Sequence, residues 1–203
     1  MSQINSTKCN RKFLFLIVSS VFMLNACGKS IDVAEWTEEA KLHDGKIVTV
    51  WRKARAYSGG FPNSNRGRDI DFEFKYAPMH VEWKGVWNRN PVSFEIIDGT
   101  AYLTLMVGDK ESCSNRPRTD YAAQFLRWSD GQWVDVKQAD FPVDKAMLNL
   151  SEGYWGHSTT DDYKGLIRWD SKQLAGADRY KNPITVKAFF ENYHQLCQIF
   201  FSN

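Results

Sequence analysis

The residue types that most often perform catalysis or bind metals are few in this chain and widely separated. Its four histidines are His43, His80, His157 and His194, and no pair has the spacing that places two ligands on one strand face or helix turn. The sequence also lacks the Gly-x-Ser-x-Gly, His-Glu-x-x-His and Cys-x-x-Cys motifs and a phosphate-binding glycine-rich loop. We therefore predict no catalytic residue, no metal ligand and no cofactor.

Two charged clusters invite a chemical interpretation, but a solvated surface explains each of them. Asp69, Asp71 and Glu73 alternate with apolar residues, which is typical of the wet face of a strand, and Phe74 stands where a calcium loop needs glycine. A basic cluster surrounds a loop at 58–63 and consists of Arg52, Lys53, Arg55, Arg66 and Arg68. We expect these basic side chains to be solvated, with an anionic partner as the alternative.

The main compositional surplus is aromatic, with 8 Trp, 8 Tyr and 13 Phe. A β domain of this size can bury most of them, since each contributes about 150–250 Å² of surface. Trp83 and Trp87, close to Gly85, and Trp155, flanked by glycine and tyrosine, have the residue types of a stacking platform for a sugar ring. Core packing is the favoured interpretation, and a sugar platform is the alternative.

Length and charge limit the class of protein. The chain has 203 residues, 43% hydrophobic and 25% charged, which suffices for one compact domain with a sizeable core. Its 26 basic and 24 acidic residues nearly cancel, so nucleic acid is not an expected partner. No Pro/Gly/Ser-rich linker divides the chain after its N-terminal segment, which predicts a single domain.

The N-terminal segment has the order of a secretory signal peptide. Lys8, Arg11 and Lys12 precede an apolar run at 13–24, and small residues follow that run. A hydrocarbon core needs about 20 apolar residues to be crossed, so the run is too short for a membrane span. We therefore predict that this segment is cleaved.

The segment ends in Leu24-Asn25-Ala26-Cys27. A leucine three residues before a cysteine, with a small residue directly in front of it, resembles the lipobox of bacterial lipoproteins. The resemblance implies that diacylglycerol, carrying fatty acyl chains such as palmitate, is attached to the Cys27 thiol before cleavage. We expect 1–26 to be a lipoprotein signal peptide, 27–34 a lipidated tether and 35–203 a single β-rich periplasmic domain. The alternative is an ordinary signal peptide with Cys27 in a disulfide.

Such an anchor determines where the protein resides. Two or three acyl chains hold a protein stably on a membrane, at about 0.8 kcal/mol per buried methylene. The lipoprotein resemblance implies export to the outer membrane, because Gly28 rather than Asp follows Cys27; Lys29 and Ser30 occupy positions that act as retention signals in some bacterial groups. We expect a periplasmic-facing protein on the outer membrane, with the inner membrane as the alternative.

The remaining cysteines predict a disulfide. Cys9 leaves with the signal peptide and Cys27 is acylated, so Cys113 and Cys197 are the pair left in an oxidising compartment. Their bridge would join the loop after the second hairpin to the end of a C-terminal helix. The alternative is that both are free cysteines buried as small apolar residues.

Turn chemistry predicts the strands. Asp44-Gly45, Asp98-Gly99 and Asp130-Gly131 lie between stretches of strand-like composition, and Asp-Gly supplies the positive φ angles of a two-residue type I′ turn. The predicted hairpins pair 35–42 with 46–56, 92–97 with 100–107, and 122–128 with 132–136. A further strand at 69–76 is indicated by its alternation of apolar and charged residues.

The C-terminal part has helical periodicity, and Thr185 is a suitable N-cap. Apolar residues recur at three- and four-residue steps, namely Val186, Phe189, Phe190, Tyr193, Leu196 and Cys197. We predict a mainly β fold of antiparallel hairpins, with a C-terminal α-helix packed on it and ending near Cys197. Sandwich, barrel and twisted sheet all fit the spacing.

These features predict a lipid-anchored envelope protein that binds a protein or cell-wall partner and is not an enzyme. One alternative is a periplasmic carbohydrate- or small-ligand-binding module that uses exposed Trp residues. A second alternative is a hydrolase whose site is assembled by folding around His157, with Ser158, Asp161 and Asp162 nearby.

Overall fold

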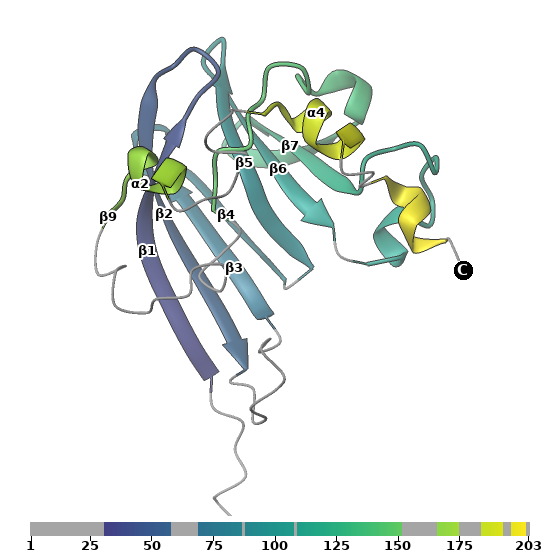
Figure 1. Cartoon of the computed structure of the whole chain (residues 1–203), viewed down its shortest axis with the longest axis horizontal. Helices are drawn as coiled ribbons and strands as arrows, with labels where there is room; N and C mark the ends of the chain where they lie inside the picture. Colours follow the sequence, from purple (N-terminus) through teal and green to yellow (C-terminus); the bar gives the residue numbers. More distant parts are fainter. Residues whose placement is uncertain are drawn as a thin grey trace, which may run out of the picture. The chain divides into compact units, whose positions relative to one another are not determined.

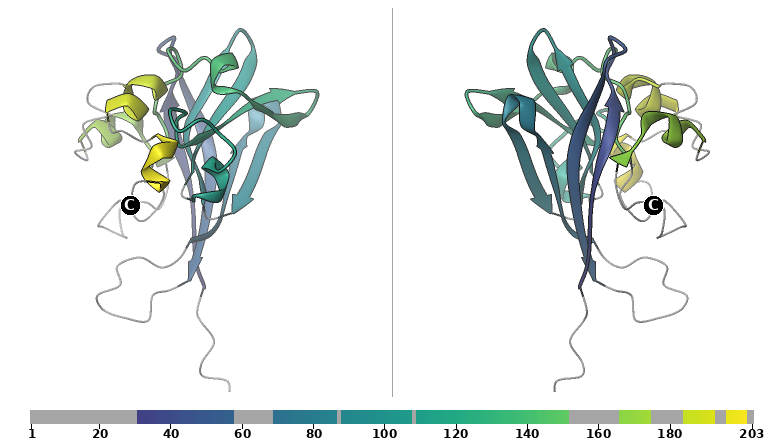
Figure 2. Two further views of the ribbon diagram at one scale, coloured as in Figure 1. Left: turned by 90° about the vertical axis from the view of Figure 1, so that its right-hand side faces the viewer. Right: turned by 90° about the vertical axis from the view of Figure 1, so that its left-hand side faces the viewer.

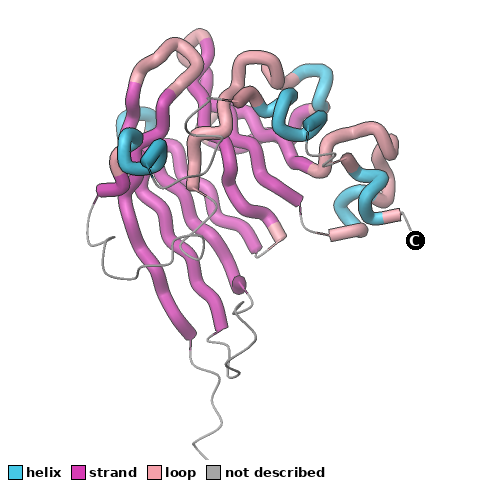
Figure 3. Tube along the Cα trace, in the orientation of Figure 1, coloured by secondary structure: helices cyan, strands magenta, loops and turns pink. Residues whose placement is uncertain are grey.

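The computed structural model describes residues 31–57, 69–86, 88–107, 109–151, 166–174, 184–192 and 196–201 (Figure 1). Strands predominate in these ranges, and the helices are short (Figure 3). The predicted mainly β fold of antiparallel hairpins with a C-terminal helix is confirmed. All of the described residues belong to one compact unit, Ile31–Asn203.

Two antiparallel meanders contain most of the strands. The first consists of β1 (Ile31–Lys41), β2 (Ile47–Tyr57), β3 (Asp69–Tyr76) and β4 (Val81–Val86), and the second of β5 (Arg89–Ile97), β6 (Thr100–Val107), β7 (Ala123–Ser129) and β8 (Gln132–Val136). The strand orders are β4-β3-β2-β1-β9 and β5-β6-β7-β8. The short β9 (Leu166–Ile167) departs from the antiparallel pattern, because it pairs parallel with Thr37 and Glu38 of β1.

Two of the three predicted tight turns are confirmed. Asp98 and Gly99 have φ angles of 52° and 76°, and Asp130 and Gly131 have 52° and 77°, so both pairs adopt the positive φ angles of a type I′ turn. The prediction of a two-residue turn is wrong at Asp44-Gly45. There only Gly45 has positive φ, and the loop is three residues long, closed by the Leu42 N–H, which donates to the Lys46 carbonyl at 2.8 Å.

The first strand begins earlier than the sequence predicted. β1 starts at Ile31, which pairs with Tyr57 of β2, so residues 31–34 belong to the sheet and not to a tether. Ala34 and Trp36 are buried on its inner face, whereas Ile31 and Val33 are exposed. The strand pattern is hidden in the sequence because exposed apolar residues weaken the alternation there.

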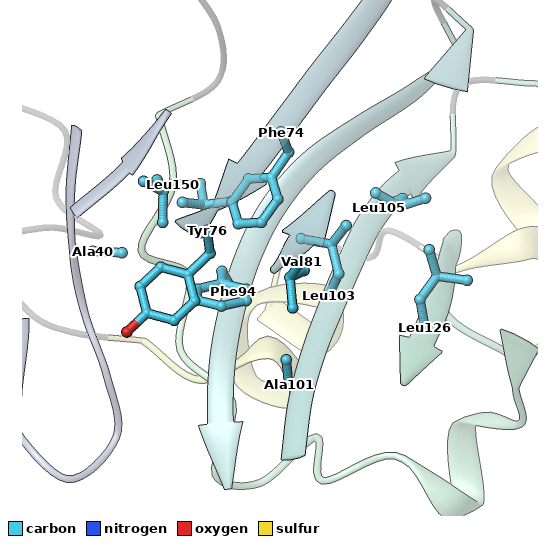
Figure 4. Packing of buried hydrophobic residues seen from close by; sticks show 11 residues of the cluster. Ala40, Phe74, Tyr76, Val81, Phe94, Ala101, Leu103, Leu105, Leu126 and Leu150 are labelled. Atoms are coloured by element: carbon cyan, nitrogen blue, oxygen red, sulfur yellow. The ribbon is translucent and has the colours of Figure 1, made fainter. Parts of the chain in front are cut away.

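The main core lies between the two sheets (Figure 4). Phe74 and Tyr76 of β3 meet Phe94 of β5, with ring centroids 4.9 Å and 5.1 Å apart. Leu103 and Leu105 of β6 belong to the same buried cluster. Facing apolar layers from two antiparallel sheets are the arrangement of a β-sandwich, which was one of the three architectures left open.

A second core covers the other face of the second sheet. It joins Phe125 of β7 to Val186 and Phe190 of α4 (Val186–Asn192), and Tyr121 stacks on Phe190 at 5.2 Å. The short C-terminal helices lie on one side of the strands (Figure 2). The Thr185 hydroxyl accepts a hydrogen bond from the Ala188 N–H at 3.2 Å, as expected of an N-cap.

The C-terminal helix is shorter than predicted. α4 ends at Asn192, and Leu196 instead forms a β-bridge with Tyr121. Cys197 begins the 3₁₀ helix η5 (Cys197–Phe200), and its N–H donates to the Asp120 carbonyl at 2.7 Å. The prediction that the helix continues to Cys197 is therefore wrong, because these backbone groups bond to the 118–121 loop.

Trp83 and Gly85 form a packing unit on β4. They stand two residues apart on β4, opposite Phe74 and Phe72 of β3. The Trp83 ring lies so close over Gly85 that an added Cβ would be 2.2 Å from it. Trp83 also packs against the buried clusters of the inner face, so only glycine at position 85 permits this ring position.

Candidate functional site

In the part of the chain that the structure describes, we consider three places where polar side chains meet, and the most buried is a cluster between β1, β2 and α2 (Trp169–Leu174). Glu38 accepts a hydrogen bond from Arg52 Nη1 at 2.7 Å and forms an ion pair with Lys172 Nζ at 2.5 Å. All three side chains are at most 1% exposed. We call these three residues the Glu38 cluster.

Backbone groups complete the Glu38 cluster. Arg52 donates to the carbonyls of Ser151 and Pro91 at 2.6 Å and 3.1 Å, and Lys172 donates to the carbonyls of Glu39 and Asn149 at 2.6 Å and 2.8 Å. Burial raises the pKa of Glu38, but the attraction of Lys172 and Arg52 outweighs it and lowers the pKa to about 2. Each member bonds to two or more protein groups, so this cluster joins distant chain segments.

This cluster also corrects the sequence interpretation of the basic residues. Arg52 points into the protein, whereas Arg55 forms an ion pair with Asp71 on the outer face of the same sheet. The predicted wet face of β3 is likewise only partly solvated, because Asp71 is 8% exposed and Glu73 pairs with Lys84 at 3.2 Å. Arg66 and Arg68 lie outside the described residues.

The second place is a histidine–carboxylate pair at the first hairpin. His43 Nδ1 lies 3.1 Å from Glu95 Oε1, and the His43 N–H donates to Glu95 Oε2 at 3.0 Å. Burial raises the pKa of Glu95, and the hydrogen bonds from His43 offset only part of that effect. A pocket of about 380 Å³ adjoins this pair, and its walls include Met147 and Trp169. His43 is an exposed residue of the turn, and its imidazole, held by Glu95, is 28% exposed.

The third place is a larger pocket of about 580 Å³ at one end of the second sheet. It lies where β5 begins and β6 ends, opposite the two type I′ turns. Phe125 and Val107 contribute apolar surface, and the rest of the lining is mostly polar. The charged side chains in that lining are Arg89, Arg116, Asp120, Asp135 and Lys137. We call this the Arg116 pocket.

The two arginines of the Arg116 pocket differ in how many of their nitrogen atoms are hydrogen-bonded to the protein. Arg89 donates to Gln124 at 3.0 Å, to Asp109 at 2.9 Å and to Ser112 at 2.5 Å, so its guanidinium is fixed. Arg116 donates from Nε to Asp120 at 3.4 Å and from Nη1 to the Ala123 carbonyl at 2.5 Å. No described residue accepts a hydrogen bond from its Nη2, which leaves donors for an anionic group.

The cysteine pair supports one wall of the Arg116 pocket. The sulfur atoms of Cys113 and Cys197 are 2.04 Å apart and the Cα atoms 5.4 Å, which is disulfide distance and is the proximity that the predicted pairing requires. Both residues are fully buried. Cys113 follows Ser112 directly, so the link to η5 tethers the 109–122 segment that carries Ser112 and Arg116.

Of the other residues singled out in the sequence, some are described by the structure and some are not. Among the described tryptophans, Trp36 and Trp169 are buried, and the partly buried ones are Trp51, Trp83, Trp128 and Trp133. Core packing, the favoured interpretation, agrees with these positions. Cys27, Trp87, Trp155, His194 and the 157–162 segment lie outside the described residues, as does the whole predicted signal peptide.

The described residues contain neither a metal-binding group nor a membrane-spanning helix. No three His, Cys, Asp or Glu side chains come together there in a way that fits a metal ion. None of the helices described has the length and apolar character needed to cross a bilayer.

The chain was also compared with known proteins. No family model matches it, and neither a curated protein nor a solved structure is significantly similar to it.

Proposed function

We propose that this protein is a lipid-anchored envelope protein whose β domain binds an anionic group of a protein or cell-wall partner in the Arg116 pocket. The anchor is Cys27, on the strength of Leu24-Asn25-Ala26-Cys27 and the basic and apolar segments before it. The observation that carries the binding role is the guanidinium of Arg116, which lines an open pocket and has one nitrogen not bonded to any described residue.

The chemistry of the Arg116 pocket favours a carboxylate. Arginine binds carboxylates through paired hydrogen bonds, and the basic residues in the lining outnumber the acidic ones. Protein side chains, protein C-termini and cell-wall peptides all offer carboxylates, so this property suits either partner class. We also propose that Cys113 and Cys197 are oxidised in the periplasm, which keeps this wall in place when a ligand binds.

The anchor is tested by metabolic labelling with a fatty acid in cells that express Cys27→Ala. We expect label incorporation to be abolished and the protein to leave the membrane fraction, because acylation requires that thiol. Cys9→Ala is the matched control and keeps both, since Cys9 precedes the predicted cleavage site. Label that persists in Cys27→Ala would disprove the anchor.

The binding role is tested with a photo-crosslinking amino acid at Ala139, an exposed residue of the Arg116 pocket lining. In intact cells we expect a discrete adduct from position 139 and none from Asp98, which lies in a turn at the opposite end of the sheet. Arg116→Gln should abolish the adduct, whereas Arg118→Gln, an exposed arginine outside the lining, should retain it. An adduct that does not depend on Arg116 would refute this assignment.

A further inference from the structure

The large apolar side chains that are exposed in the described part of the chain are unevenly distributed. Three of the six, Ile31, Val33 and Val86, gather at one end of the first sheet and are 51%, 57% and 58% exposed. The others are Ile47, Leu166 and Ile199. This end, at the bottom of Figure 1, is where β1 begins and β2 ends. We call Ile31, Val33 and Val86 the apolar rim.

Strand register places Val33 and Val86 of the apolar rim in one row of the outer face, with Ile31 two residues nearer the start of β1. Val33 is opposite Arg55, Arg55 is opposite Asp71, and Asp71 is opposite Val86. Three strand spacings of about 4.8 Å separate the two valines, so the row is about 14 Å wide. Arg55 donates from Nε to Asp71 at 2.8 Å, so the charged residues between the valines neutralise each other.

The next row toward the middle of the sheet is different in character. Its four residues in order are Glu35, Lys53, Glu73 and Lys84. Alternating charges of this kind are typical of a face that stays in water. The apolar surface is therefore restricted to the end of the sheet and does not extend along the face.

Chain length fixes how far this end can be from the proposed anchor. Ile31 is four residues after Cys27, and an extended chain spans at most about 3.6 Å per residue, so their Cα atoms are within about 14 Å. The same limit places Val33 within about 22 Å of Cys27. An acylated Cys27 sits at the membrane surface, so the apolar rim is confined to its vicinity.

We propose that the apolar rim rests on the lipid surface to which Cys27 is attached. The end of the first sheet at which β1 begins then lies against the lipid headgroups. This inference depends on the lipid anchor proposed above. Partial insertion of three aliphatic side chains removes apolar surface from water, and the neutral Arg55–Asp71 pair adds no repulsion from anionic lipids. The rim then fixes the orientation of the domain that the lipid chains merely tether.

The test uses the full-length acylated protein, reconstituted into vesicles of phosphatidylethanolamine and phosphatidylglycerol. A photo-crosslinking amino acid replaces Val33 or Val86 in two variants, and Ile47 in a matched control. Ile47 is as exposed as Ile31 but lies at the other end of β2. Lipid adducts are measured by mass spectrometry, and formation of the Cys113–Cys197 disulfide on non-reducing gels reports folding of each variant.

We expect several-fold more lipid adduct from positions 33 and 86 than from position 47. Equal yields from all three positions in acylated, membrane-bound protein would overturn the orientation and leave the anchor intact. Protein–protein adducts from position 33 would show that a second copy covers the rim, which also overturns it. A protein without acyl chains would refute the anchor, and the orientation with it.

Discussion

Glu38 and Glu95 are both fully buried carboxylates, yet their pKa values move in opposite directions. Glu38, between β1, β2 and α2, has a pKa lowered to about 2, whereas the pKa of Glu95 on β5 is raised. Burial raises the pKa of both groups. The difference lies in the partners, because Glu38 has two buried cations and Glu95 has one half-buried histidine.

The comparison shows that hydrogen bonds alone do not offset the effect of burial on the pKa of a carboxylate in this protein. Glu95 accepts three hydrogen bonds, from the His43 N–H, the His43 ring and the Ile96 N–H, and its pKa is still raised. Glu38 is held by formal positive charges at 2.7 Å and 2.5 Å. Nearby cations thus determine the direction in which the pKa of each buried carboxylate moves, and the four predictions below test this difference.

The largest effect is expected from Glu38→Gln. This change leaves Arg52 and Lys172 buried without a counter-charge, and breaking a buried pair in this way costs about 3–5 kcal/mol. Urea unfolding monitored by tryptophan fluorescence measures the free energy of unfolding. The matched control is Glu82→Gln in the same sheet, whose exposed pair with Lys75 contributes at most about 1 kcal/mol. Equal losses in the two variants would contradict the comparison.

The next effect is the response to acid. The pKa of Glu38 in the folded state lies below its unfolded value of 4.5, so its stabilising contribution is complete above pH 4.5 and is lost as pH falls toward 2. The shift corresponds to roughly 3 kcal/mol. We expect the urea midpoint of the native protein to fall over this window, and that of Glu38→Gln to fall much less. A parallel fall in both proteins would show that other groups cause acid unfolding.

Glu95→Gln should have a smaller effect than Glu38→Gln. The amide oxygen can still accept from His43, and no buried cation loses its partner, so the expected loss is about 1 kcal/mol. The pKa of Glu95 is raised, so ionising it costs folding free energy as pH rises above 4.5. The variant therefore approaches native stability as pH rises, and a loss that grows with pH would contradict this assignment.

The smallest effect is expected from His43→Gln. The hydrogen bond from the imidazole lowers the pKa of Glu95, so weakening it should raise that pKa further. Carbon-detected NMR titration of the Glu95 carboxyl measures the shift, and the Glu38 carboxyl serves as an internal control that should not move. A fall in the Glu95 pKa would mean that His43 does not stabilise the charged form.

Local chemistry explains what the sequence could predict. The Asp98-Gly99 and Asp130-Gly131 turns depend on adjacent residues, and so does the capping of α4 by Thr185. The Glu38 cluster has a weaker sequence pattern. On β1, Glu38 alternates with the buried residues Ala34 and Trp36 and shares their face. On β2, Arg52 lies in the same way between the buried residues Val50 and Ala54. A single charged residue on the apolar face of each of two paired strands indicates a buried ion pair.

The other features required tertiary information. His43 and Glu95 are 52 residues apart, and neither residue has a local pattern that predicts the other as its partner. The Arg116 pocket is formed by the ends of four strands and by the segment linked through Cys113, so its shape arises only when the second sheet is complete. Turn residues and hydrophobic periodicity contain no information on contacts between residues that are far apart in the sequence.

The position of Lys172 in the sequence determines the order in which the contacts of the Glu38 cluster can form. β1 and β2 are neighbours in the chain and can pair as soon as both are made, whereas Lys172 donates to the Glu39 carbonyl across 133 residues. A growing chain therefore holds Glu38 with only one of its two cations until α2 arrives. The first hairpin can pair early, but its buried charge cluster is complete only once α2 packs against it.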